Sequence, residues 1–183
     1  MISRTSTDSA WLNVLRMCFF SVLFIACRGA QAEQHCDSVP ENTPGDSFTV
    51  NTDGTVTHNT TGLMWARCAS GQTWDESNQS CTGIANQVTW VAALTLANTT
   101  TFAGYTDWRL PNIKELSSIV ERMCVEPSIN LSLFPNTPSE NFWTSTTLTN
   151  EPTRAWSFAF YNGKNNSKDK SVDLFLRFVR FEK

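Results

Sequence analysis

The residues in this chain with the clearest chemistry are its cysteines. Two lie in an apolar N-terminal segment and four follow it; together they are Cys18, Cys27, Cys36, Cys68, Cys81 and Cys124. The N-terminal segment has the character of a secretory signal peptide, and four cysteines in a secreted chain predict two disulfides, with three pairings open. We favour Cys68 with Cys81, because a local bridge would order the polar segment between them. Cys36 with Cys124 would then tie the start of the mature chain to the end of a helix.

The same cysteines do not fit a metal site or a catalytic site. After residue 32, no two cysteines have the spacing of two to four residues that zinc sites use. His35 and His58 lie in flexible or turn-like sequence, and the Gly-x-Ser-x-Gly motif of a hydrolase nucleophile does not occur. We therefore expect a protein that is not an enzyme and that holds no metal or other cofactor.

Charge is distributed unevenly along the chain. Residues 33–153 carry four basic and thirteen acidic residues, whereas residues 154–183 carry seven basic and three acidic residues. A local excess of cations attracts polyanions by Coulomb steering, although charges around a hairpin are often only a solvated surface. We expect an acidic or sulfated glycan, or a surface protein, as the partner, and no nucleic acid. The candidate binding cations are Lys164, Lys168, Lys170, Arg177 and Arg180.

Trp74 is a further candidate for ligand binding. It lies in the polar loop between Cys68 and Cys81, where its ring would be free to stack on a sugar. The other tryptophans after residue 33 fall in predicted elements or tight corners, where packing in the core is more common.

The N-terminus has the features of a secretory signal peptide. Arg4 and Arg16 precede the apolar run of residues 17–26, and Ala30-Gln31-Ala32 is a small-x-small cleavage site. Residues 1–32 are therefore predicted to be removed, because the run is shorter than the roughly 20 residues that span a bilayer. A retained anchor, and a lipoprotein anchored at Cys27, are the alternatives. We expect a secreted, periplasmic or cell-surface protein.

Residues 33–46 are a polar, irregular lead-in, and the folded domain is expected over residues 47–183. Thr89 is a candidate cap for the first helix, and Asp53-Gly54 is a turn signal between two short strands. The elements expected in this half are strands over 48–50, 55–58 and 63–66 and a helix over 90–97.

The segment DWRLPNIKEL, residues 107–116, predicts a second helix with a defined start. Pro111 disfavours helix before it, and Asn112 followed by Glu115 is a capping box. Apolar residues at a 3.6-residue period continue the helix to about Arg122. We expect Trp108 and Arg109 to lie mostly inside the fold.

The remaining sequence is typical of strands. Strands are expected at residues 142–146 and 156–160, and Asn162-Gly163 is a turn signal. Residues 162–171 are interpreted as a flexible loop. Residues 172–181 are apolar at both odd and even positions, so a central strand covered on both faces is expected there. Two short helices and a small, mainly antiparallel sheet with disulfide-tied loops make an α+β domain.

Several of these motifs resemble one family, named after the C-terminal domain of the Legionella collagen-like adhesin. The resemblance covers nearly all of residues 47–183. It implies a fold related to C-type lectin-like domains and to formylglycine-generating enzymes. The motifs that carry it are TGLMWARC (61–68), GQTWD (71–75), GYTDWRLPNIKELSSIV (104–120), INLSLFP (129–135), FWTST (142–146), RAWSFAF (154–160) and FLRFVR (175–180).

The resemblance implies a secreted bacterial adhesion module that binds sulfated polysaccharides through basic residues. The named adhesin also trimerises, but this chain has no Gly-x-y repeat, so the oligomeric state stays open. One alternative is a disulfide-stabilised surface domain without a small ligand. A formylglycine-generating enzyme would need a cysteine pair near the C-terminus, and none follows Cys124. A calcium-dependent lectin is the third alternative, although Ser128 stands where its Glu-Pro-Asn ligand motif has asparagine.

Overall fold

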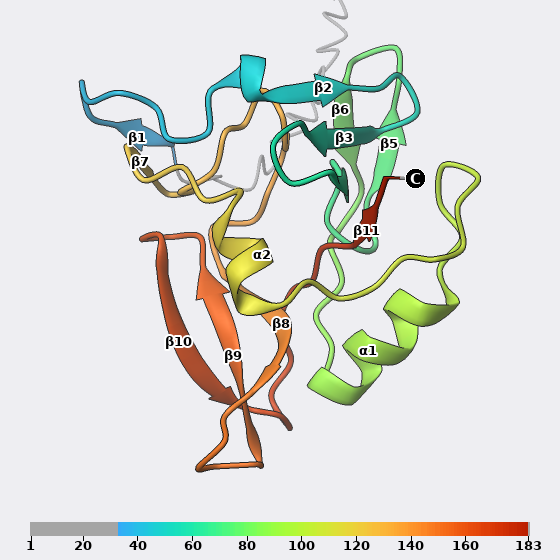
Figure 1. The fold of residues 1–183 in the computed structure, drawn as a ribbon, viewed down its shortest axis with the longest axis vertical. Coiled ribbons are helices and arrows are strands. Elements are labelled where there is room, and N and C mark those ends of the chain that lie inside the picture. Colours follow the sequence, from blue (N-terminus) through green and yellow to red (C-terminus); the bar gives the residue numbers. More distant parts are fainter. Residues whose placement is uncertain (1–32, 183) are drawn as a thin grey trace, which may run out of the picture. The chain divides into compact units, whose positions relative to one another are not determined.

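Four small antiparallel sheets and two α-helices make up residues 33–182, the part of the chain that the computed structural model describes (Figure 1). The predicted signal peptide and the alternative anchor at Cys27 lie outside these residues. The α+β class is confirmed. The elements are β1 (His35–Cys36), the 3-10 turn η1 (Gly45–Ser47), β2 (Phe48–Val50), β3 (Thr55–His58), β4 (Leu63–Ala66), β5 (Thr73–Asp75), β6 (Ser80–Thr82), α1 (Trp90–Thr99), α2 (Ile113–Ser117), β7 (Cys124–Val125), β8 (Asn141–Thr147), β9 (Arg154–Ala159), β10 (Lys164–Asp169) and β11 (Val179–Phe181).

A four-stranded sheet has the strand order β11-β4-β3-β2, and its first three strands in sequence match the predicted ranges. The turn between β2 and β3 forms because Asp53 accepts hydrogen bonds from the backbone and hydroxyl of Thr55. Gly54 has φ +85°, and a Cβ there would lie 2.6 Å from the Trp74 ring. Only glycine satisfies both conditions. All four residues of β4 are buried, in keeping with its interior place in the sheet.

Different helices pack on the two faces of the three-stranded sheet β10-β9-β8. Side chains of a strand alternate between faces, so neighbours in β8 belong to different hydrophobic clusters. Phe142 packs in the cluster that contains Leu116 of α2. Trp143 packs with Ala93 and Ala97 of α1. The sheet therefore fixes where both helices lie.

The C-terminal strands differ from the prediction. The segment expected to be a flexible loop contains β10, which pairs with β9 from Lys164 opposite Ala159 to Asp169 opposite Arg154. The Asn162-Gly163 turn sends the chain straight back along β9, because the amide of Gly163 donates to the carbonyl of Ala159.

The apolar segment after β10 is buried on both sides but is not one long strand. Only β11 forms at its end, on the edge of the four-stranded sheet. Before β11, the chain runs between the two sheets: the carbonyl of Phe175 accepts from Trp143, and the carbonyl of Phe178 accepts from Ala66. Burial on both faces therefore reflects packing between sheets rather than a central place in one.

The helices also depart from their predicted lengths. α1 extends to Thr99, and Thr89 precedes it without a side-chain cap bond. α2 ends at Ser117, before the predicted end at Arg122.

Beyond α2, the buried carboxylate of Glu121 accepts hydrogen bonds from Thr43, Asn42 and Met123. This carboxylate ties the lead-in to the chain that leaves the helix.

Both favoured disulfides are present. Cys68 bonds to Cys81, the middle residue of β6, which pairs with Trp74 of β5. Cys36 bonds to Cys124 across the β1–β7 pair, with 88 residues of sequence separation. A bridge across so long a segment restricts the unfolded chain strongly, by about 4–5 kcal/mol in the chain-entropy model.

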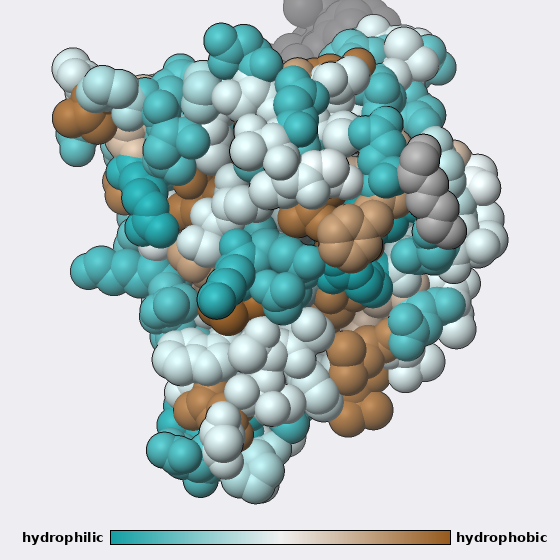
Figure 2. All heavy atoms as spheres, viewed as in Figure 1, coloured by the Kyte–Doolittle hydropathy of each residue, from teal (hydrophilic) through white to brown (hydrophobic). Residues whose placement is uncertain are grey.

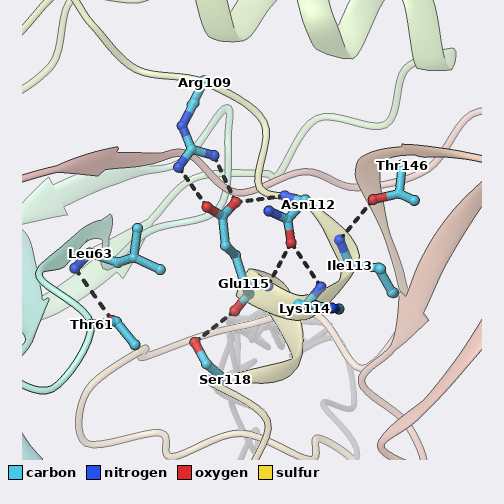
Figure 3. Close-up of polar contacts among 9 residues, drawn as sticks. All are labelled: Thr61, Leu63, Arg109, Asn112, Ile113, Lys114, Glu115, Ser118 and Thr146. Carbon is cyan, nitrogen blue, oxygen red and sulfur yellow. Dashed lines mark hydrogen bonds and ion pairs between the residues drawn. The ribbon is translucent and has the colours of Figure 1, made fainter.

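The predicted capping box is present at the start of α2 (Figure 3). Asn112 Oδ1 accepts from the backbone amides of Lys114 and Glu115, both at 2.9 Å. The Glu115 carboxylate accepts from the Asn112 amide at 2.8 Å and from both terminal nitrogens of Arg109 at 2.7 Å. A helix of five residues is not stable alone, so these bonds are needed to hold it. Trp108, 2% exposed, lies inside as expected, and Arg109 is half-buried.

We expect Glu115→Gln to lower the free energy of unfolding by an amount that depends on pH. Burial acts to raise the pKa of Glu115, but the hydrogen bonds from Arg109 and Asn112 outweigh it and hold that pKa below its ordinary value. A carboxylate whose pKa is lowered by folding stabilises the fold at pH values above its pKa in the unfolded chain, near 4.3. This stabilisation is lost as the pH falls through the pKa of the folded state. At neutral pH the substitution should cost about 1–3 kcal/mol of unfolding free energy in urea titrations.

The cost of Glu115→Gln should shrink as pH is lowered from neutral to about 3, because the wild-type carboxylate is then protonated. Glu140→Gln, at an exposed position, is the control and should stay within about 0.5 kcal/mol of wild type. A cost for Glu115→Gln that does not change with pH would contradict the assignment.

Candidate functional site

The three candidate lysines lie on or directly after β10, the edge strand of the three-stranded sheet. Lys164 is exposed, and Lys168 is half-buried. Lys170 is held against the protein: its Nζ donates to the carbonyl of Pro152 at 2.7 Å and lies 4.1 Å from the centre of the Trp90 ring. Lys164 is thus the lysine of β10 best placed to meet a ligand.

The structure removes Arg177 from the predicted binding surface. Its side chain is fully buried, and burial lowers its pKa to about 9. The guanidinium donates to the carbonyl of Ala66 at 2.9 Å, to the carbonyl of Arg67, and to Thr137 Oγ1 at 2.7 Å. A polysaccharide cannot reach it. Sequence reasoning missed this because the charge of Arg177 suggested a surface position.

Arg180 is also buried, with 5% of its surface exposed. Its Nε donates to Asp107 Oδ1 at 2.6 Å, and its guanidinium lies 3.9 Å from the centre of the Tyr105 ring. This arginine joins β11 to the segment before α2. It therefore acts within the fold, and it is not part of the accessible basic surface.

Trp74 lies on β5 and is half-buried. Its indole nitrogen donates to the carbonyl of Thr52 at 2.9 Å, and the guanidinium of Arg67 lies 4.3 Å from its ring centre. The ring also covers Gly54. Trp74 thus holds the β5–β6 hairpin against the β2–β3 turn, and that hairpin lies at the opposite end of the view from β10 (Figure 1).

One cation that the sequence did not single out lies beside Lys164. The exposed Arg122, just beyond α2, lines a hollow of about 290 Å³ with Lys164 at the start of β10. Ser117 and Asn165 add a hydroxyl and an amide to its rim, and no acidic residue lines it. Arg122 is held in place because its backbone amide donates to Asn42 Oδ1. No spacing in the sequence predicts that Arg122 and Lys164 meet.

The face of the protein in view is mostly hydrophilic, and its hydrophobic patches are small and separate (Figure 2). Large exposed apolar patches commonly mark protein or membrane interfaces. On this face, polar and charged groups therefore offer the larger contact area.

Residues 54–180 match the family model of the Lcl C-terminal domain. The chain belongs to this family. The match extends from the turn before β3 to β11, includes both helices, and confirms the resemblance seen in the sequence. A search of curated proteins found no match.

Membership of the Lcl C-terminal domain family makes this chain an adhesin-related module. The family and the two disulfides indicate an extracellular or surface protein. Within residues 33–182, no helix has the length and apolar character that crossing a bilayer requires.

We expect Arg177→Leu to destabilise the fold without changing ligand affinity. The substitution leaves two buried carbonyls and the Thr137 hydroxyl without their donor, which should cost about 2–4 kcal/mol. Urea unfolding measures this loss. Arg177→Lys should not restore stability, because a single ammonium group cannot reach all three acceptors as the planar guanidinium with its several N–H donors does. Retention of the folded variant on a heparin column should equal that of wild type; a stable variant with lost retention would contradict this role.

Proposed function

We propose that this chain is a secreted, non-catalytic binding module that recognises an anionic polysaccharide through the hollow between Arg122 and Lys164. The observation that carries the proposal is that two exposed cations from different elements line one hollow that has no carboxylate in its wall. Cations that are not neutralised by the protein are available to a sulfate or carboxylate group of a ligand.

The groups around the hollow suit an anionic sugar unit. A guanidinium donates to two oxygens of a sulfate or carboxylate at once, and an ammonium supplies a compact charge. The Ser117 hydroxyl and the Asn165 amide can bond the hydroxyl groups of the same sugar. Lys168 continues the positive charge along β10.

One such site is weak. Exposed ion pairs are worth about 0–1 kcal/mol each and are screened by salt. A polymer with repeated charges compensates, because several sites that bind one chain raise the overall avidity. This favours a long polysaccharide over a single small anion.

A C-type lectin-like framework is part of the proposal. Two short helices around a small antiparallel sheet and two disulfide-tied segments support it. A binding role is also favoured over a thiol enzyme, since all four cysteines among residues 33–182 are paired in disulfides.

Heparin chromatography tests the proposal. Wild type should be retained, and Arg122→Gln with Lys164→Gln should elute at clearly lower salt because the hollow loses both charges. The matched control is Arg154→Gln with Lys170→Gln, which removes the same charge. Arg154 already pairs with Glu151, and Lys170 already donates to the carbonyl of Pro152. Because these two cations have partners within the protein, the control should elute close to wild type.

Equal losses in both double variants would show that retention follows net charge, and the hollow would lose its role. No retention of wild type at low salt would favour the alternative, a structural surface domain without this ligand. Repeating the column with calcium and with a chelator separates a calcium-dependent lectin, whose retention would require the metal.

A further inference from the structure

A cavity between the end of β4 and the C-terminal end of α1 has no part in the proposed function. Its volume is about 270 Å³, just below the roughly 300 Å³ at which drug-sized ligand pockets begin. Its walls come from residues 68–72, from Asn86, from residues 100–102 and from Phe178. None of the residues that line the Arg122–Lys164 hollow lines this cavity.

The walls of this cavity are fixed by bonds to the rest of the fold. The amide of Ser70 donates to the carbonyl of Leu176 at 3.0 Å, and the amide of Asn86 donates to the carbonyl of Ser70 at 2.7 Å. Cys68 is held by its disulfide to Cys81. On the other side, the Phe102 ring lies 5.8 Å from the Trp108 ring. A preformed cavity loses less freedom when a ligand binds.

The lining combines aromatic rings with hydroxyl and amide groups. Phe102 and Phe178 supply two rings, and no charged residue lines the cavity. Ser70 and Thr101 supply hydroxyl groups to the lining and Asn86 supplies a side-chain amide, and Asn86 and Thr101 are exposed to solvent. These groups converge on one space from three separate segments of the chain.

We propose that this cavity binds one neutral sugar ring. A pyranose has an apolar C–H face that packs on an aromatic ring and a rim of hydroxyls that exchange hydrogen bonds with hydroxyl and amide groups. A charged ligand would lose its hydration and find no opposite charge in the lining. A wholly apolar ligand would bury the three polar groups without partners. The volume limits the ligand to about one ring.

NMR titration of the ¹⁵N-labelled protein, produced from its full-length gene, tests this site. The probes are D-glucose, D-galactose, D-mannose and N-acetyl-D-glucosamine. At least one should cause saturable shifts at the amides of Ser70, Asn86 and Phe102, with a dissociation constant of about 1 mM, as expected for so small a ligand.

Asn86→Ala should weaken that binding by about fivefold or more, because the side-chain amide is lost while the backbone bond to Ser70 remains. Asn98→Ala, at an exposed position of α1, is the matched control and should bind like wild type. If Asn86→Ala does not fold, Thr101→Val, also at an exposed position, repeats the test.

Three results would each overturn the proposal. They are no shifts with any of these sugars, shifts centred on Lys164 and Asn165, and equal binding by wild type and the folded variants. Heparin retention should be unchanged in Asn86→Ala, because the Arg122–Lys164 hollow is a different site. The two proposals can therefore fail independently.

Discussion

The guanidinium of Arg177 lies fully buried where the C-terminal segment crosses the end of β4, and it joins parts of the chain that are far apart in sequence. It donates to the carbonyl of Ala66 and to Thr137, and it lies 4.9 Å from the centre of the Phe134 ring. Hydrogen bonds of a charged donor are strong in a low-dielectric interior. Arg67 extends this connection, because it donates to the carbonyl of Leu133. Loops that belong to no sheet are thereby attached to the four-stranded sheet.

The two candidate sites both lie where separate elements meet on this framework. The Arg122–Lys164 hollow lies between the end of α2 and the β9–β10 turn, and the capping box sets where α2 begins. The neutral cavity lies between the loop after β4 and the end of α1, and the Cys68–Cys81 disulfide secures its wall. In each case hydrogen bonds of the backbone fix the segments that carry the side chains of the site, which lowers the entropy lost on binding.

Local signals predicted the local structure well. The Asp53-Gly54 turn, the Asn112–Glu115 capping box and the short Cys68–Cys81 bridge each depend on residues close in sequence, and each is present. The prediction of one long strand after Ser171 was wrong, because periodicity records burial on two faces without showing what covers them. The prediction of the binding residues was the least accurate, because the charge of an arginine does not reveal whether backbone carbonyls surround it in the fold.

The sequence by itself determined the family, the α+β class, the local Cys68–Cys81 bridge and the start of each helix, because these follow from residue types and short spacings. Only the tertiary structure decided which cations are accessible. It placed Arg177 and Arg180 inside and brought Arg122 beside Lys164. The physical reason is that exposure depends on packing between segments far apart in the chain, where the cost of burying a charge is offset by partners that no local pattern encodes.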